Sequence, residues 1–275
     1  MVIDVAKCEN CNNCLLACKD EFVDNDWPGY SLAQPDLGQK WITITGKERG
    51  QYPTIDVAYL PAPCQHCDNA PCIKAAKDGA INKRPDGIVI IDPVKARGQK
   101  SLVNACPYGA IWWNEEKNVP QKCTFCAHLL DNGWKQPRCV QSCPTGALSM
   151  RYVEDKEMQN IIAAEGLEVH EAKHNTAPHV YYKNLYRFNR CFIAGSVAIQ
   201  VEGKDECANS AGVTLTRVPG ETISECVTDN YGDFKFDNLE ENSGNYIVDI
   251  TYPGYENKTI EVDLKTSINI GTIFL

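Results

Sequence analysis

The spacing of the cysteines constrains this chain more than any other feature. Twelve of its fifteen cysteines lie before residue 144. Three thiolates that are two residues apart can cover one face of an iron–sulfur cubane, whereas a cysteine four residues further on points away and ligates another cluster. The spacing therefore predicts clusters that occur in pairs and exchange their fourth ligands. The groups are Cys8-x2-Cys11-x2-Cys14-x3-Cys18, Cys64-x2-Cys67-x4-Cys72, Cys106-Pro107 and Cys123-x2-Cys126 followed by Cys139-x3-Cys143-Pro144.

The spacing alone also pairs the groups. In the outer pair, Cys143 completes the first triplet and Cys18 completes the last one, while in the inner pair Cys106 completes the middle triplet. This arrangement uses all twelve cysteines and predicts three clusters. Cluster A is assigned to Cys8, Cys11, Cys14 and Cys143, cluster B to Cys18, Cys123, Cys126 and Cys139, and cluster C to Cys64, Cys67, Cys72 and Cys106.

Other uses of the cysteines fit the pattern less well. A disulfide scaffold has a similar cysteine density, but it belongs to secreted chains, and Met1 to Val5 lack the basic region and long apolar stretch of a secretion signal. Structural zinc uses two separate Cys-x2-Cys pairs, which would leave the third cysteine of the first triplet without a role. Iron–sulfur ligation is therefore the favoured interpretation.

No catalytic residue is predicted in this chain. The sequence contains no phosphate-binding loop, no strand-linked G-x-G-x-x-G and no nucleophile elbow. A cubane that is held by four cysteines has no open iron position for a substrate. Cubanes of this kind accept electrons and pass them on. We therefore expect electron transfer.

Five motifs and one strand resemble a known family. They are CENCNNCLLAC, CQHCDNAPC, ACPYGAI, KCTFC and PRCVQSCPTGAL, with GIVIID between the second and third. Over residues 1–190 the sequence resembles the four-cluster ferredoxin-type electron-transfer subunits of molybdopterin oxidoreductases related to dimethyl sulfoxide reductase. The resemblance implies a pseudo-symmetric double module with [4Fe-4S] clusters. It also implies a heterodimer with a large catalytic subunit, which alone carries molybdopterin guanine dinucleotide and molybdenum.

The resemblance further implies that a fourth cluster has been lost. Alignment on Cys106-Pro107-Tyr108-Gly109 and on Gly79-Ala80 gives the positions of its four ligands in this sequence. No cysteine occupies any of them, whereas every ligand of the other three clusters is present. In membrane-linked relatives this site is expected beside a quinol-reactive anchor, so no membrane anchor is expected here. The four positions are Ala76, Ala96, Gln99 and Leu102.

Charge and hydropathy narrow the choice of partners. The formal net charge of −9 and the pI near 5.1 argue against nucleic acids and anionic membranes, whose phosphates would repel the chain. The longest apolar run, Phe192 to Val201, has about half of the 18–20 residues that span a bilayer. Together with the missing secretion signal, this predicts a cytoplasmic protein.

The sequence changes character near Arg190, where we expect a domain boundary. From there, short apolar–polar alternations are separated by turn residues, which predicts an all-β sandwich. The run Val227–Leu239, with Tyr246 and Gly254-Tyr255, resembles the prealbumin-like modules of carboxypeptidase regulatory domains. The fold class is thus predicted as α+β, with an iron–sulfur domain at 1–190 and a sandwich at 191–275. The predicted strands are 211–217, 221–228, 232–236, 246–252 and 258–264.

Within the first domain, a strand pair at 41–45 and 54–59 is expected to turn around Gly46 and Gly50, and a helix is expected from 154 to 164, ending near Gly166. His66 and His128 lie inside the cysteine motifs, where exposed or packing roles are favoured over hydrogen bonds to a cluster.

Two other classes of function stay open at this point. The chain can be the electron-transfer subunit of a respiratory molybdenum reductase or dehydrogenase with another substrate. It can also be a scaffold protein in which the clusters only support the fold.

Overall fold

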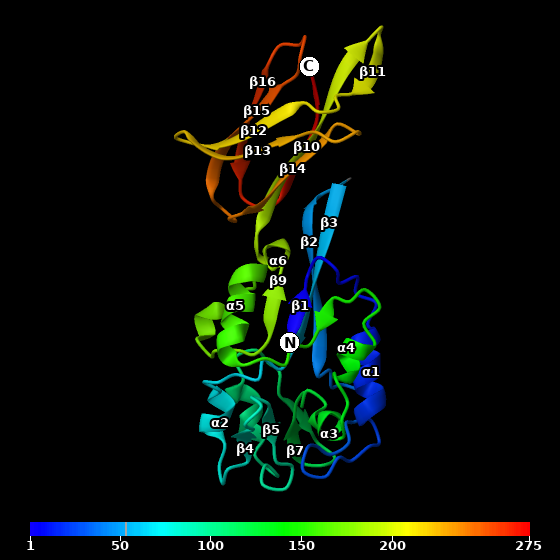
Figure 1. Cartoon of the computed structure of the whole chain (residues 1–275), viewed down its shortest axis with the longest axis vertical. Coiled ribbons are helices and arrows are strands. Elements are labelled where there is room, and N and C mark those ends of the chain that lie inside the picture. Colours follow the sequence, from blue (N-terminus) through cyan, green and yellow to red (C-terminus); the bar gives the residue numbers. More distant parts are fainter. Residues whose placement is uncertain (53) are drawn as a thin grey trace. The chain divides into compact units, whose positions relative to one another are not determined.

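The computed structural model describes residues 1–52 and 54–275 and divides into two compact units (Figure 1). The first unit comprises Met1–Gly46 and Tyr59–Leu185, and the second comprises Lys47–Ala58 and Tyr186–Leu275. The division at Tyr186 lies close to the boundary expected near Arg190. The inclusion of Lys47–Ala58 in the second unit was not expected from the sequence. Within the described residues, no helix has the length and apolar character that a membrane span requires.

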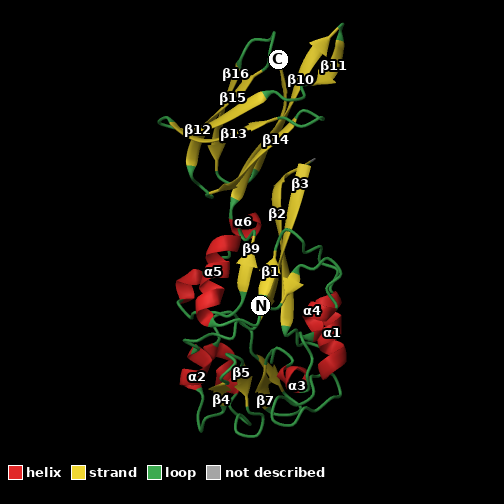
Figure 2. Ribbon diagram, viewed as in Figure 1, coloured by secondary structure: helices red, strands yellow, loops and turns green. Residues whose placement is uncertain are grey.

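The first unit consists of short elements joined by loops (Figure 2). Its central sheet has β1 (Val2–Asp4) between antiparallel β8 (Leu148–Ser149) and parallel β9 (Tyr181–Lys183). Two small hairpins accompany it, β4 (Ile81–Lys83) with β5 (Val89–Ile91) and β6 (Trp112–Asn114) with β7 (Val119–Gln121). Elements this short bury little apolar surface, so bonds to metal would add rigidity that packing does not supply. The helices are α1 (Asn13–Phe22), α2 (Pro71–Ala75), η1 (Lys100–Ala105), α3 (Ala127–Asp131), α4 (Arg138–Gln141), α5 (Asp155–Glu165) and η2 (Ala172–His174).

The predicted helix near residue 154 is confirmed as α5. It ends where Gly166 adopts the left-handed conformation, with φ of 61°. That conformation is the usual reason for glycine just after a helix, because glycine has no Cβ to clash there.

The predicted turn around Gly46 and Gly50 is wrong. Strand β2 (Ile42–Gln51) continues through both glycines, and its partner strand is β3 (Thr54–Pro63). A Cβ on Gly46 would lie only 3.3 Å from Cε1 of Tyr59. The glycine therefore makes room for a neighbouring ring inside the hairpin, which is a common role for glycine within strands.

The second unit is built from two sheets. In one sheet, β10 (Cys191–Val201) is central, with β14 (Asp233–Leu239) and β11 (Lys204–Cys207) antiparallel and β17 (Ile268–Phe274) parallel to it. The other sheet has the order β13 (Glu221–Val227), β12 (Gly212–Arg217), β15 (Gly244–Thr251) and β16 (Lys258–Leu264), all antiparallel. The five predicted strands are confirmed, whereas β10, β11 and β17 were not predicted. The short helix α6 (Tyr186–Asn189) precedes β10.

One apolar core joins these two sheets. Ile193 and Phe236 from the first sheet, and Leu215 and Val248 from the second, are all buried in it. Side chains alternate between buried and exposed along β14 and β15, as they do in strands with one face toward a core. The chain is thus of the α+β class, with a largely β C-terminal part.

The segment Lys47–Ala58 packs on the first of these sheets. The guanidinium carbon of Arg49 lies 5.0 Å from the ring centroid of Phe192 in β10. Arg49 is buried and pairs with Asp56 at 3.2 Å and with Asp237 in β14. These contacts explain why the segment clusters with the C-terminal strands although it is distant in sequence.

Candidate metal centres

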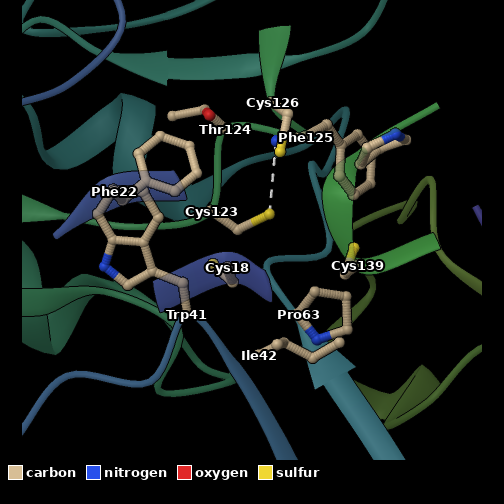
Figure 3. Close-up of a pocket in the computed structure, with 11 residues that line it drawn as sticks. Cys18, Phe22, Trp41, Ile42, Pro63, Cys123, Thr124, Phe125, Cys126 and Cys139 are labelled. Atoms are coloured by element: carbon tan, nitrogen blue, oxygen red, sulfur yellow. Dashed lines mark hydrogen bonds between the residues drawn. The ribbon is translucent and has the colours of Figure 1, made fainter. Parts of the chain in front are cut away.

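Four cysteines from separate parts of the first unit surround a cavity (Figure 3). They are the four residues assigned to cluster B, and about 320 Å³ of space among the lining residues, part of it open to solvent, holds no protein atom. Phe22, Trp41 and Phe125 form much of its apolar wall. The backbone N–H of Phe125 donates a hydrogen bond to Sγ of Cys123 at 3.4 Å, drawn as a dashed line in Figure 3. The cysteines are Cys18 on α1, Cys123 and Cys126 just before α3, and Cys139 on α4.

A second cavity holds the four cysteines assigned to cluster C. About 340 Å³ of space among its lining residues, part of it open to solvent, holds no protein atom, and Val89, Ile111 and Lys122 contribute to its wall. The backbone N–H of Ala110 donates to Sγ of Cys106 at 3.4 Å. Such N–H donors are the usual neighbours of thiolates that ligate iron–sulfur clusters. The four cysteines are Cys64, Cys67, Cys72 and Cys106.

The thiols assigned to cluster A also come together, closer to the surface. Burial raises the pKa of Cys14, and Cys8, Cys11 and Cys143 raise it further by charge repulsion, so these sulfurs are near one another. Cys11 is exposed and Cys8 and Cys143 are partly exposed. Cys14 is carried by α1, and Cys143 follows α4.

Cys143 differs from the other thiols in its hydrogen bonds. Burial by itself would raise the pKa of Cys143, but backbone N–H groups of Leu148, Ala147 and Thr145 bond to its sulfur. With the hydroxyl of Thr145, they hold the pKa below its ordinary value. This thiol is therefore prepared to carry negative charge.

The interior thiols have the opposite tendency in the absence of a cation. Burial raises the pKa of Cys67 and Cys72 to about 11 and that of Cys126 to about 12. Desolvation penalises each thiolate, and the neighbouring thiols add repulsion. Such groups become thiolates only when a cation replaces their protons, which is what metal ligation does. The donor set therefore fits iron.

Two buried polar atoms in the cavity walls support the same conclusion. Within the described residues, neither Thr124 Oγ1 beside the first cavity nor His66 Nε2 beside the second has a hydrogen-bond partner. His66 Nδ1 accepts the backbone N–H of Val89 at 3.0 Å, so a neutral ring carries its proton on Nε2. An unsatisfied buried donor costs about 1–3 kcal/mol. The sulfide ions of a cubane are acceptors that suit both donors.

The positions assigned to the lost fourth cluster lie together in a packed region. Ala96 and Leu102 are fully buried in an apolar core, and Ala76 packs against that core. The side chain of Gln99 accepts the N–H of Lys77 at 3.0 Å and donates to the carbonyls of Lys77 and Lys95 at 3.3 and 2.9 Å. Apolar side chains thus pack this region, and the hydrogen bonds of Gln99 connect its loops. The loss of a cluster itself stays a prediction.

Of the exposed or packing roles expected for His66 and His128, the structure shows packing, and a third side chain near the cavities, Lys122, was missed by the sequence analysis. His66 is fully buried and stacks on Phe125 with ring centroids 3.8 Å apart, and His128 is buried beside Glu21 at 2.9 Å. Lys122 is buried as well, with its ammonium among backbone carbonyls. In the sequence, the only indication of this role was the position of Lys122 directly before Cys123 and after the short segment that forms β7.

Comparison with known proteins agrees with these centres. Residues 55–153 match a family model described as a 4Fe-4S dicluster domain. The small subunit of pyrogallol hydroxytransferase from Pelobacter acidigallici is 44% identical over 279 residues, which cover 100% of this chain and 98% of that protein. The chain belongs to the family of this small subunit. The iron–sulfur interpretation and the expectation of [4Fe-4S] clusters are thereby confirmed, and the number of clusters stays a prediction.

More distant members of the family match a smaller part of the chain. A tetrathionate reductase subunit of Salmonella typhimurium is 31% identical over 67% of the chain and 72% of its own length. A probable anaerobic dimethyl sulfoxide reductase chain of Escherichia coli is 33% identical over 66% of the chain and 86% of its own length. These matches confirm the resemblance to subunits related to dimethyl sulfoxide reductase. Among solved structures, 5-hydroxyisourate hydrolase of Klebsiella pneumoniae covers 30% of the chain with a TM-score of 0.25, which is too low to carry an argument.

Proposed function

We propose that this chain is the iron–sulfur electron-transfer subunit of a molybdenum enzyme, and that the enzyme is a pyrogallol hydroxytransferase. One observation carries the choice of enzyme. The pyrogallol hydroxytransferase small subunit matches 100% of the chain, whereas the reductase subunits at 31–33% identity match 66–67% of it. The full-length match therefore favours this enzyme over a respiratory reductase.

The chain holds three [4Fe-4S] clusters in this proposal, with the ligand sets A, B and C. A [4Fe-4S] cluster bound by four cysteines accepts one electron and returns it without binding a substrate. The protein contributes buried thiols, an apolar wall that excludes water and N–H donors to the sulfurs. Because Cys11 is exposed, cluster A is the centre closest to solvent and the natural point of exchange with a partner.

The partner in this proposal is a large catalytic subunit that carries molybdenum and molybdopterin guanine dinucleotide. Transfer of a hydroxyl group between two aromatic rings involves no net oxidation. A chain of clusters that ends at cluster C is then sufficient, because it needs only to set the oxidation state of the metal. The packed region around Ala96 and Leu102 supports this view, since no cysteine occupies the positions of a fourth centre.

The second unit is proposed as a prealbumin-like module for structure or interaction, and the complex as a cytoplasmic heterodimer without a membrane anchor. The two-sheet arrangement with one shared core supports a sandwich. Fractionation of cells with an antibody against this chain tests the location. Recovery of the chain with the membranes after a salt wash contradicts it.

Anaerobic purification of the chain with its natural partner tests the main proposal. We expect about twelve iron atoms and about twelve acid-labile sulfides per chain, in line with three cubanes. We also expect molybdenum in the partner and conversion of pyrogallol to phloroglucinol. A partner without molybdenum or tungsten contradicts the proposal. A molybdenum-containing partner that reduces another substrate and leaves pyrogallol unchanged favours a respiratory reductase.

A further inference from the structure

Lys122 is a buried cation in the wall of the cluster C cavity. It has 2% of its surface exposed, and it directly follows β7. Its Nζ donates hydrogen bonds to the carbonyl oxygens of Val89 at 2.5 Å and of Cys123 at 3.0 Å. Within the described parts of the chain, no carboxylate oxygen lies within 4.0 Å of this nitrogen. The ammonium therefore has carbonyl dipoles around it and, among the described residues, no carboxylate in contact with it.

A buried ammonium in this position needs negative charge nearby. Removal of an ammonium from water costs several kcal/mol, and neutral carbonyls offset only part of this. The nearest source of negative charge is the set of thiols that share the cavity with Lys122. Cys72 and Cys106 are two of these thiols, and both line the same cavity as Lys122.

The charges around the other two centres are different. Lys122 directly precedes Cys123 of cluster B and donates to its carbonyl oxygen, but it lines the cluster C cavity and not the cluster B cavity. Beside cluster B, Arg138 approaches Cys126, but Glu21 approaches the same thiol and pairs with Arg138 at 3.2 Å. The charges of this pair largely cancel. Beside cluster A, burial is the main cause that raises the pKa of Cys8. The neighbouring thiols raise it further, and the negative charge of Glu9 adds to their effect. Among the described residues that line the two cavities, Lys122 in the cluster C cavity is the only lysine or arginine.

We propose that Lys122 is the fixed counter-charge of cluster C and that it raises the reduction potential of this cluster above those of clusters A and B. This inference rests on the proposed function, because it requires the three clusters. On reduction, the cluster takes up one electron from its donor, no bond is formed or broken, and the negative charge beside the ammonium increases by one. The ammonium attracts the reduced form more strongly than the oxidised form. Of the three clusters, cluster C is then the one that an electron occupies preferentially.

Redox titration of the purified complex, followed by electron paramagnetic resonance, tests the role of Lys122. Lys122→Met keeps an unbranched side chain that is one heavy atom shorter, and it removes the charge. We expect the reduction equilibrium of cluster C to shift at least about tenfold toward the oxidised form, which corresponds to about 59 mV for one electron. Lys122→Arg keeps the charge and should retain most of the original potential. A Cys106→Ser variant identifies the signal of cluster C, because it changes one ligand of that cluster only.

Lys100→Met is the matched control. This lysine is exposed and pairs with Glu115 at 2.5 Å, so all three potentials should stay unchanged. Lys122→Gln gives a second neutral variant with a polar side chain. Loss of cluster C in both neutral variants, with retention in Lys122→Arg, also supports the inference, because the charge is then needed to hold the cluster at all.

Two results separate failure of this inference from failure of the proposed function. If Lys122→Met keeps its full iron content and all three potentials match the unsubstituted protein, the inference is wrong and the electron-transfer role stands. The same holds if cluster C of the unsubstituted protein has a lower potential than cluster A or B. If the unsubstituted protein itself contains clearly fewer than about twelve iron atoms, the three-cluster proposal fails first.

Discussion

Cys18 belongs to the first cysteine motif in the sequence and to the cluster B cavity in space. It lies on α1, four residues after Cys14, and lines the same cavity as Cys123, Cys126 and Cys139. The spacing of the motif foretold this separation, because cysteines two residues apart share a cubane while the fourth serves another. One thiol of the first motif therefore lies in the same cavity as thiols that are more than 100 residues away in the sequence, as the proposed exchange of ligands requires.

Replacement of Cys18 tests this exchange of ligands. Cys18→Ala should remove cluster B and leave clusters A and C, so about one third of the iron is lost. Iron and sulfide assays on anaerobically purified protein measure the loss, and electron paramagnetic resonance shows which signal disappears. Cys207→Ala, at an exposed cysteine of the second unit, should keep all the iron. Loss of the cluster A signal instead would mean that Cys18 ligates the cluster of its own motif.

Thr124 offers a second test at this scale. Its buried hydroxyl lies in the wall of the cluster B cavity without a partner among the described residues. A hydroxyl that donates to a cluster sulfur stabilises the reduced, more negative state. Thr124→Val should therefore lower the reduction potential of cluster B, as measured by redox titration, and leave that of cluster C in place. An unchanged potential would show that the hydroxyl donates elsewhere.

The sequence predicted the thiols of the candidate site better than their surroundings. Cysteine spacing is a local pattern, so the sequence alone groups the thiols into sets of four. Two of these sets line cavities in the structure. The orientation of Thr124, the unsatisfied nitrogen of His66 and the burial of Lys122 depend on which segments meet in space. No pattern within a few residues records that information.

At the scale of elements, η1 and α2 surround the positions of the predicted lost cluster. Leu102 on η1 and Ala96 before it are part of one apolar core, and Gln99 ties the loop to Lys77. The sequence defines these positions only by the absence of cysteines. The structure adds that apolar side chains pack together there.

Leu102→Ala tests whether this packing stabilises the first unit. Because Leu102 is fully buried, its truncation should lower the free energy of unfolding by about 2–4 kcal/mol. Urea denaturation under anaerobic conditions, followed by loss of cluster absorbance, measures the change. Val94→Ala, at a side chain with 79% of its surface exposed, should change it by less than about 0.5 kcal/mol. Equal stability of the two variants would mean that the region is not a working core.

The elements that were missed share a physical cause. Strand β10 has an almost continuous apolar sequence because both of its faces are covered, and such a run lacks the alternation that marks a strand with one exposed face. In the hairpin of β2 and β3, Gly46 and Gly50 suggested a turn, although Gly46 lies within a strand and makes room for the ring of Tyr59. Strands with one exposed face, such as β14 and β15, were recognised from their alternation.

At the scale of the whole molecule, the second unit is assembled from two distant stretches of chain. A network of charges holds them together, in which Asp56 pairs with Arg49 and Lys235 at 3.2 Å and with Arg187 at 2.7 Å. Burial by itself would raise the pKa of Asp56, but Lys235, Arg187 and Arg49 together keep it below its ordinary value. A carboxylate with a lowered pKa in the folded state stabilises the fold only while it is ionised.

This network predicts a dependence of stability on pH. The contribution of Asp56 is fully present above its unfolded pKa of about 3.9 and is lost as the pH falls below that value, through the lower pKa of the folded state. Hydrogen exchange of the β10 and β14 amides, corrected for intrinsic rates, should therefore accelerate below about pH 4. Asp56→Asn should lower protection at pH 7 and flatten the response in this acidic range. If hydrogen exchange accelerates equally below about pH 4 in the unsubstituted protein and in Asp56→Asn, a group other than Asp56 causes the acceleration.

The second unit consists of an early and a late segment of the chain, so the two segments are synthesised at different times. Arg49 leaves the ribosome 188 residues before its partner Asp237, a delay of about 10–40 s at about 5–20 residues per second. All twelve cysteines of the candidate clusters have been translated by then, so iron can be inserted into a nascent chain. Arg49, by contrast, gains its partners Phe192 and Asp237 only after β10 and β14 have been synthesised. Iron insertion can therefore precede the docking of this segment on β10 and β14.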